Sequence, residues 1–111
     1  MKKLNWYWIG TQYADGNWLR PSKENSCFFR GKDDNSFTVT TFCGKQTGTY
    51  ELHQKNIAIE IDVIIDEKWV ESKTDARFID DFNQVINLDQ DGNRLSLRIS
   101  NDAGVMHFQK K

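Results

Sequence analysis

Two cysteines and two histidines carry the strongest nucleophilic chemistry in this 111-residue chain. A thiolate at Cys43, with His53 or His107 as its base, would provide the nucleophile of a thiol-dependent enzyme. The residues around Cys43 form no local protease signature, and a cysteine at a strand end is commonly a small buried residue. We therefore favour a structural role for Cys43 and expect no enzyme.

Metal and cofactor sites have weak support. Asp89–Asn93 superficially resembles a calcium loop, but an EF-hand places glycine sixth and glutamate twelfth. Here Gly92 is fourth counting from Asp89, and no glutamate follows. His53 and His107 have no neighbouring Cys or His in the sequence, which argues against zinc. We expect a hairpin turn at Asp91–Gly92, with neither metal nor cofactor.

Cys27 and Cys43 leave two alternatives open, a disulfide or two buried thiols. If Cys27–Arg30 and Ser36–Cys43 pair across Gly31–Asn35, the two cysteines lie near each other but not necessarily opposite. A disulfide needs Cα atoms within about 7 Å, and the spacing does not fix that distance.

Aromatic residues make up 13% of the chain and are the other candidate recognition groups. Neighbouring side chains of a strand face opposite ways, so at least one ring in Trp6-Tyr7-Trp8 must face outward or lie under a loop. An exposed patch would mark a protein or glycan surface. The alternative, to which we give more weight, is that loops and a helix cover the rings. The candidate surface consists of Trp6, Tyr7, Trp8, Trp18 and Trp69.

Short strands are the main elements that position these residues. Apolar and polar residues alternate between turn residues such as Asp15-Gly16-Asn17, which is typical of antiparallel sheet. We expect about seven to eight strands, with Asn17–Arg20 as a short edge piece. The segments are Trp6–Ile9, Cys27–Arg30, Ser36–Cys43, Thr49–Leu52, Asn56–Ile65, Val85–Leu88, Arg94–Ile99 and Val105–Phe108.

The hydrophobic period then changes to that of a helix, from about Lys73 to Val85. Ser72 and Asp75 resemble a capping box. The apolar face consists of Phe78, Ile79, Phe82, Val85 and Ile86, and the solvent face of Asp80, Asp81 and Asn83. The predicted fold class is α+β, mainly antiparallel β. It is a small curved sheet or barrel whose single late helix plugs one opening.

Length and charge indicate one domain spanning residues 1–111. Fifteen basic and sixteen acidic residues give a net charge of −1, and no basic block suggests nucleic-acid binding. No run approaches the roughly 20 apolar residues of a membrane-spanning helix. Met1–Lys3 resembles the start of a secretory signal, but Leu4–Ile9 is too short an apolar run. The location is therefore periplasmic or outer-membrane associated if a leader was removed, and otherwise cytoplasmic.

Several motifs, taken in order, resemble the META domain, also called the HslJ-like family. The strand Ser36–Thr41 runs into a Cys…Gly-x-Tyr segment, and an acid-x-x-Phe helix and a Gly-x-x-Leu-x-Leu hairpin follow. The resemblance covers nearly the whole chain. The residues that carry it are Trp6, Cys43, Gly48, Tyr50, Asp75, Phe78, Gly92, Leu95 and Leu97.

The resemblance implies a META-type barrel-like fold. By analogy with bacterial members, it also implies an envelope location, often in a lipoprotein, without an established activity. Gly44 replaces the family's usual asparagine, and the family's second cysteine before the helix is missing, so any disulfide must use Cys27. We expect Gly48 to permit a close approach and Tyr50 to fill core.

The preferred hypothesis is a non-enzymatic module that binds another protein or has a structural role, with an oligomeric state that the sequence does not fix. The alternative is a barrel that holds an apolar ligand, and the weakest hypothesis is an enzyme centred on Cys43.

Overall fold

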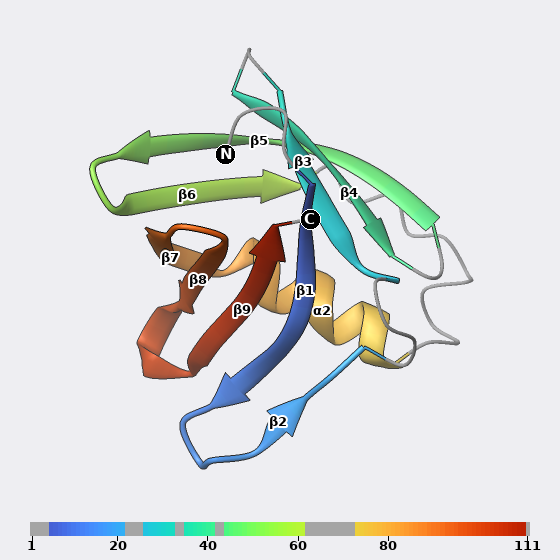
Figure 1. Ribbon diagram of the computed structural model, residues 1–111, viewed down its shortest axis with the longest axis vertical. Helices are drawn as coiled ribbons and strands as arrows, with labels where there is room; N and C mark the ends of the chain where they lie inside the picture. Colours follow the sequence, from blue (N-terminus) through green and yellow to red (C-terminus); the bar gives the residue numbers. More distant parts are fainter. Residues whose placement is uncertain (1–4, 22–25, 33–34, 42–43, 62–72, 111) are drawn as a thin grey trace.

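Antiparallel strands closed into a barrel dominate the computed structural model, which describes residues 5–21, 26–32, 35–41, 44–61 and 73–110 (Figure 1). Within these residues, eight strands form the ring in the order β1-β3-β4-β5-β6-β7-β8-β9, and β9 pairs back to β1. The short β2 is added at the edge of β1. The predicted α+β barrel with one late helix is therefore confirmed. The elements are β1 (Asn5–Tyr13), β2 (Trp18–Leu19), β3 (Phe28–Gly31), β4 (Ser36–Thr41), β5 (Gly44–His53), β6 (Asn56–Ile61), α2 (Lys73–Asn83), β7 (Val85–Asp91), β8 (Arg94–Ile99), the 3₁₀ turn η1 (Ser100–Asp102) and β9 (Gly104–Lys110).

Strand β1 closes the barrel because it pairs on both edges. It pairs with β9 along most of its length, with β3 near its start and with β2 near its end. The register with β9 shifts between Trp8 and Gly10. A bulge of this kind bends a strand, and here Gly10 and Thr11 are both buried although they are neighbours in sequence.

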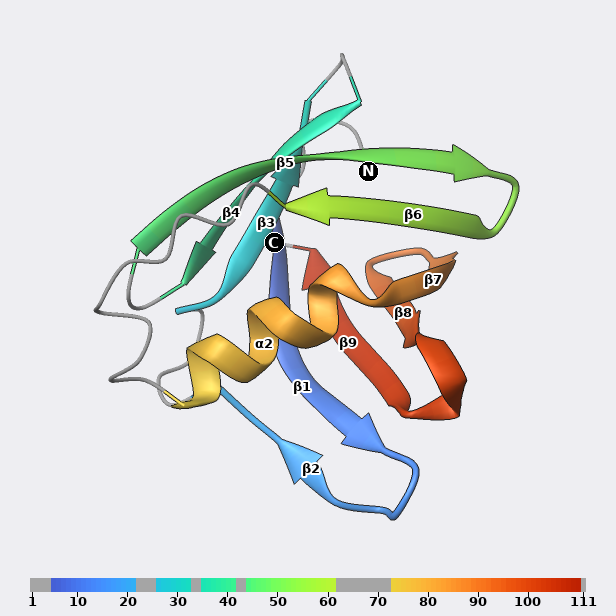
Figure 2. The same cartoon turned by 180° about the vertical axis from the view of Figure 1, so that it is seen from behind.

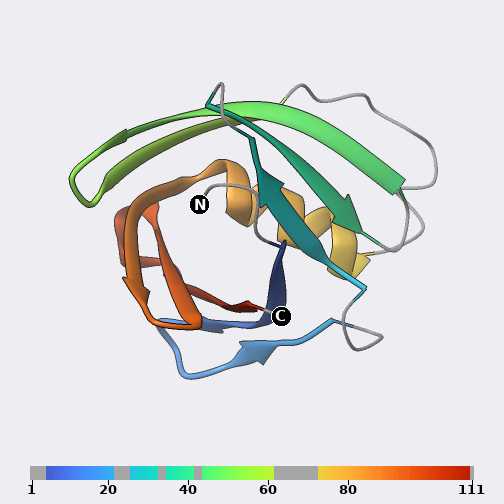
Figure 3. The same ribbon diagram turned by 45° about the horizontal axis from the view of Figure 1, so that its top comes forward.

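The helix covers the weakest side of the ring. Strands β6 and β7 share one residue pair, Asn56 with Asn87, among the described residues. Helix α2 lies beside this side of the barrel, and in the view from behind it passes in front of β1 and β9 (Figure 2). The amide of Ile61 donates to Asn83 Oδ1 at 3.4 Å. Figure 3 shows α2 within the ring of strands. The helix thus takes the plugging position that the sequence predicts.

Large rings fill the space between the helix and the strands. Phe82 of α2 packs against Phe29, Phe37 and Phe108, with ring centroids 5.1, 5.4 and 6.3 Å apart. The core is therefore built by the helix together with strands from around the barrel. The largest fully buried side chains are Trp6, Trp8, Phe29, Phe37, Phe78, Phe82, Phe108, Leu95, Leu97, Ile99, Met106 and Val39.

The positions predicted for Ile86 and Asp81 are wrong. The helix ends at Asn83, so Ile86 lies on β7, where it is 47% exposed, and does not continue the apolar helical face. Pairing of Val85 with Ile99 of β8 extends the chain there, which overrides the helical period. Asp81, predicted on the solvent face, is only 4% exposed, whereas Asp80 and Asn83 are exposed as predicted.

Candidate functional site

The cysteine chemistry remains a prediction because Cys43 lies outside the described residues, as do Ser72, Trp69 and positions 62–65 of the predicted strand Asn56–Ile65. Cys27 is fully buried. His53 is exposed at the end of β5, and His107 is half-buried on β9. Within the described ranges, no group of three or more His, Cys, Asp or Glu is placed to hold a metal ion. No described helix has the length and apolar character needed to cross a bilayer.

The predicted aromatic surface divides between the inside and the outside of the barrel. Trp6 and Trp8 are 0% and 2% exposed, so they are not part of the candidate surface, and the preferred alternative of covered rings applies to them. Both point inward because strand side chains alternate, and Tyr7 between them faces outward. Tyr7 packs on Phe28 with ring centroids 5.0 Å apart. Trp18 is 43% exposed, and among the candidate tryptophans in the described part of the chain it is the one that lies on the outside.

Trp18 is held in place by its neighbours, which with it form what we call the Trp18 cluster (Trp18, Arg20 and His107). The ring stacks on His107 at a centroid distance of 5.3 Å, and the guanidinium of Arg20 lies 4.9 Å from the ring centroid. Gly10 lies beneath, since a Cβ there would be 3.2 Å from Trp18 Cε3. Burial lowers the pKa of His107, with a further contribution from the charge of Arg94. The imidazole is therefore kept neutral over a wider pH range, and it presents an uncharged face to the indole.

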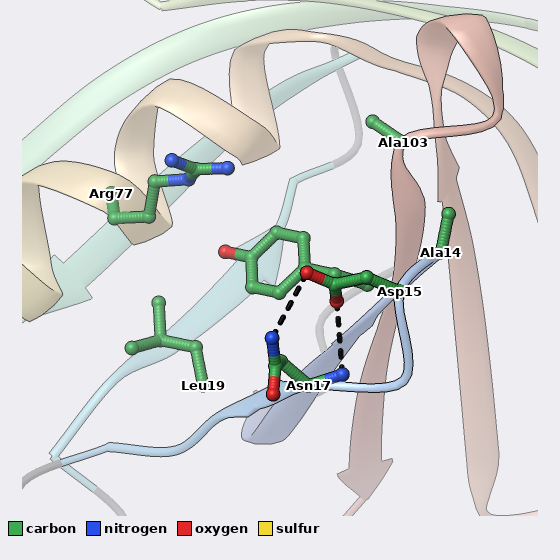
Figure 4. A pocket seen from close by; sticks show the side chains of 7 residues that line it. Ala14, Asp15, Asn17, Leu19, Arg77 and Ala103 are labelled. Carbon is green, nitrogen blue, oxygen red and sulfur yellow. Dashed lines mark hydrogen bonds between the residues drawn. The ribbon is translucent and has the colours of Figure 1, made fainter.

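A pocket of about 510 Å³ lies next to β2, between the end of β1 and α2 (Figure 4). Leu19, the neighbour of Trp18, lines it. Asp15 accepts hydrogen bonds from the Asn17 amide and side chain at 3.0 and 2.9 Å, which fixes the turn at its rim. The pocket and the cluster thus share one short strand. The lining residues are Tyr13, Ala14, Asp15, Asn17, Leu19, Arg77 and Ala103.

A buried carboxylate joins the wall of this pocket to the helix. The hydroxyl of Tyr13 donates to Asp81 Oδ2 at 2.6 Å, and Nε of Arg77 donates to the Asp81 oxygens at 3.2 and 3.3 Å. The guanidinium also lies 4.9 Å from the centroid of the Tyr13 ring. Asp81 therefore holds both groups at once and fixes the end of β1 against α2.

The electrostatics of this network favour fixed charges over proton transfer. Burial raises the pKa of Tyr13 to about 12, and the hydrogen bond and charge of Asp81 contribute to this rise. The charge of Asp81 likewise raises the pKa of Arg77. A general acid or base acts best with a pKa near the working pH. Tyr13 thus remains a neutral donor at neutral pH, and the network supports positioning more than catalysis.

Sequence reasoning missed Tyr13, Arg77 and Asp81 as a group. The available signal was the four-residue spacing of Arg77 and Asp81, which allows an ion pair on a helix. A second signal was the position of Asp81 directly before the core residue Phe82. Tyr13 lies 68 residues from Asp81 in the sequence, so no local sequence pattern indicates that the two are in contact.

The remaining motif residues lie in structural positions. A Cβ on Gly48 would be 2.4 Å from the carbonyl oxygen of Glu60 and 2.6 Å from Phe37 Cζ, so the expected close approach is present. Gly92 has φ +59° in the predicted hairpin turn. Tyr50, Phe78, Leu95 and Leu97 are buried in the core, with Tyr50 8% exposed. Asp75 lies within α2.

Comparisons with known proteins define the fold and no more. No family model matches the chain, and no curated protein matches it. A crystal structure of a DUF4847 family protein from Bacteroides vulgatus is similar, with a TM-score of 0.77 at 16% identity over 96% of this chain and 92% of that one. An NMR structure of a protein from Burkholderia xenovorans is also similar, with a TM-score of 0.71 at 8% identity over 99% of this chain and 83% of that one. The chain thus shares a small-barrel fold with these two bacterial proteins.

Proposed function

We propose that this chain is a META-type barrel domain that acts as a non-enzymatic protein-binding module. Seven of the residues that carry the resemblance occupy a close contact between strands, a hairpin turn or the core: Trp6, Gly48, Tyr50, Phe78, Gly92, Leu95 and Leu97. Residues at such positions determine the fold and do not form a binding site. Fold alone does not imply function, so the binding role rests on the outer surface of the barrel.

The observation that carries the binding role is the half-exposed Trp18 beside a pocket, on a barrel whose centre is filled. Tryptophan, tyrosine and arginine are the residue types enriched at binding hot spots, and here Trp18, Arg20, Tyr13 and Arg77 surround β2. The contacts of Trp18 with Gly10, His107 and Arg20 hold its ring in one orientation. A pre-positioned ring loses little side-chain entropy on binding.

The filled interior argues against the alternative of an apolar ligand in the barrel. A site for a small molecule needs a cavity of roughly 300–1,000 Å³. Rings from α2 and from β1, β3, β4 and β9 occupy the centre in van der Waals contact. The pocket beside Trp18 instead opens on the outside of the barrel, so recognition at the surface fits the geometry better.

We place this module in the bacterial envelope on the strength of the family resemblance. Cell fractionation of the source organism with an antibody against the domain tests this location. Recovery with periplasmic or outer-membrane fractions would support the envelope location, and recovery with cytosolic proteins would contradict it.

The binding role is tested by cross-linked capture from fractions of the source organism. The Trp18→Ala variant should lose the captured partner, while Ile86→Ala should retain it. Ile86 is a matched control because it is 47% exposed against 43% for Trp18 and lies on a different strand. Equal capture by both variants, each confirmed to be folded by thermal unfolding, would contradict a binding role for Trp18.

A further inference from the structure

A second surface, on the outer face of β3, β4 and β5, has the form of a groove. The side chains of β4 that point outward are Ser36, Thr38 and Thr40, which are all short. Longer side chains flank them on β3, whereas on β5 Lys45 is long and Thr47 and Thr49 are short. The pairing register places Arg30 beside Thr38, and Lys45 beside Thr40. These short side chains leave a depression of about 650 Å³ along β4, with longer side chains at its border. We call this the β4 groove. Its lining residues are Asn5, Phe28, Arg30, Gly31, Lys32, Thr38, Thr40 and Lys45.

The charge of the β4 groove is entirely positive among the residues that line it. Arg30, Lys32 and Lys45 are exposed, and no ion pair joins them to another described residue. The chain as a whole carries a net charge of −1, so this groove is not part of a generally basic surface. Folding gathers three cations that are spread along 16 positions of the sequence, from 30 to 45.

The neighbouring outer surface has the opposite charge. A second depression, of about 600 Å³, is lined by Glu51 and Glu60 on β5 and β6. Both carboxylates are exposed, and the lining of that depression holds no lysine or arginine. The positive region is therefore short, and along β5 it ends between Lys45 and Glu51.

The groove also offers apolar contact at one end. The half-buried ring of Phe28 lines it and packs against Tyr7 on β1. Across the strands, Thr40 lies between Phe28 and Lys45, and Thr38 is paired with Arg30. An extended chain spanning the six residues of β4 covers about 20 Å, which fits a short peptide with carboxylate side chains and an apolar residue at one end.

We propose that the β4 groove docks a short acidic segment of a partner protein. Carboxylates of the segment would pair with Arg30, Lys32 and Lys45, and the threonine hydroxyls would donate hydrogen bonds to its polar groups. Electrostatic complementarity of this kind raises association rates and selects the partner. The β4 groove is separate from the Trp18 cluster, which lies on β2 and β9, so this inference goes beyond the proposed function and does not depend on it.

A nucleic acid fits this surface less well than an acidic segment. A longer phosphate backbone that followed the strands would reach Glu51 and Glu60, which repel it. Proteins that bind single strands also present open ring faces for base stacking, whereas Phe28 and Tyr7 are half-buried against each other.

Fluorescence anisotropy with a labelled deca-glutamate peptide tests the proposal on the full chain. We expect saturable binding that weakens as salt rises, because exposed charges are screened over about 8–10 Å near physiological ionic strength. The triple variant Arg30→Gln, Lys32→Gln and Lys45→Gln should weaken binding by about threefold to a hundredfold, since each exposed ion pair contributes about 1.4-fold to fivefold.

The matched control removes the same charge elsewhere, with Lys55→Gln, Arg94→Gln and Arg98→Gln. These cations lie outside the lining of the groove, and the control should keep its affinity within about twofold, as exposed charges at a distance are largely screened. No saturable binding by the folded wild type would overturn the proposal, as would equal losses in the two triple variants. If a single-stranded oligonucleotide bound more tightly and displaced the peptide, the occupant of the groove would be a nucleic acid and the proposal of an acidic segment would be overturned.

Discussion

Trp8 and Trp18 show how the same residue type serves two regions of this molecule in different ways. Trp8 lies inside the barrel, 2% exposed and 4.8 Å from the ring of Phe78. Trp18 lies outside, held by contacts on one side and open to solvent on the other. Inside, a ring contributes to stability through the area that it buries. Outside, the same kind of ring contributes little to stability and is available to a partner.

The largest effect should come from emptying the centre of the barrel. Phe82→Ala removes a ring that packs against Phe29, Phe37 and Phe108, and the cost should be about 3–5 kcal/mol of unfolding free energy. Urea unfolding measures it, with Ile86→Ala as the control that changes stability by less than about 0.5 kcal/mol. A loss below about 1 kcal/mol for Phe82→Ala would mean that the centre is not tightly packed.

A smaller loss should follow from adding volume where two strands approach closely. Gly48→Ala places a Cβ 2.4 Å from the Glu60 carbonyl oxygen and 2.6 Å from Phe37 Cζ. The strands must separate, at a cost of about 1–3 kcal/mol. Thermal unfolding should show this loss. A Cβ added at the exposed Gly16 would meet nothing within 4 Å, although φ there is +90°, so Gly16→Asn at that turn should cost less. If Gly16→Asn lost more stability than Gly48→Ala, the close approach of the strands at Gly48 would be contradicted.

The network between β1 and α2 should have an intermediate effect with its own pH dependence. Tyr13→Phe leaves the buried Asp81 carboxylate without one donor, which should cost about 1–2 kcal/mol at neutral pH. Folding raises the pKa of Tyr13 from 10.0 to about 12. The stabilisation is therefore fully present below pH 10 and is lost as the pH rises toward 12. The difference in unfolding free energy between wild type and Tyr13→Phe should shrink over that range. A constant difference would contradict the network.

The smallest effect on stability should come from the exposed ring. Trp18→Ala leaves β2 and the Gly10 backbone in place and should cost less than about 1 kcal/mol, as is usual for surface substitutions. Chemical unfolding of Trp18→Ala and Trp8→Ala, measured under the same conditions, compares the two losses of unfolding free energy. If the two variants lost similar stability, Trp18 would be a core residue in effect, and its availability to a partner would fall.

Much of the fold follows from local pattern. Arg94–Ile99 is the same strand in prediction and structure, and Asp15–Asn17 and the turn at Gly92 lie where glycine and asparagine favour them. These elements depend on alternation and turn chemistry within a few residues. The strand that begins at Asn5 extends to Tyr13, beyond the predicted Ile9. A bulge buries Gly10 and Thr11 together, and this breaks the simple alternation.

The site was less predictable because it depends on distant contacts. The buried Asp81 accepts a hydrogen bond from Tyr13, 68 residues away, and no helical pattern encodes that partner. Likewise, whether Trp8 or Tyr7 faces the core depends on which face of β1 is covered. The β4 groove arises from register across three strands, so a scan along the sequence sees only scattered cations.

Photo-cross-linking tests the central claim, that the module binds its partner on the outer surface at Trp18, most directly. A benzophenone amino acid would replace Trp18 in one variant and Ile86 in another, and each would be irradiated in fractions of the source organism. We predict a specific cross-linked protein from position 18 that is absent from position 86, with both variants folded. Cross-linking from position 86 alone, or none from either position, would contradict the claim.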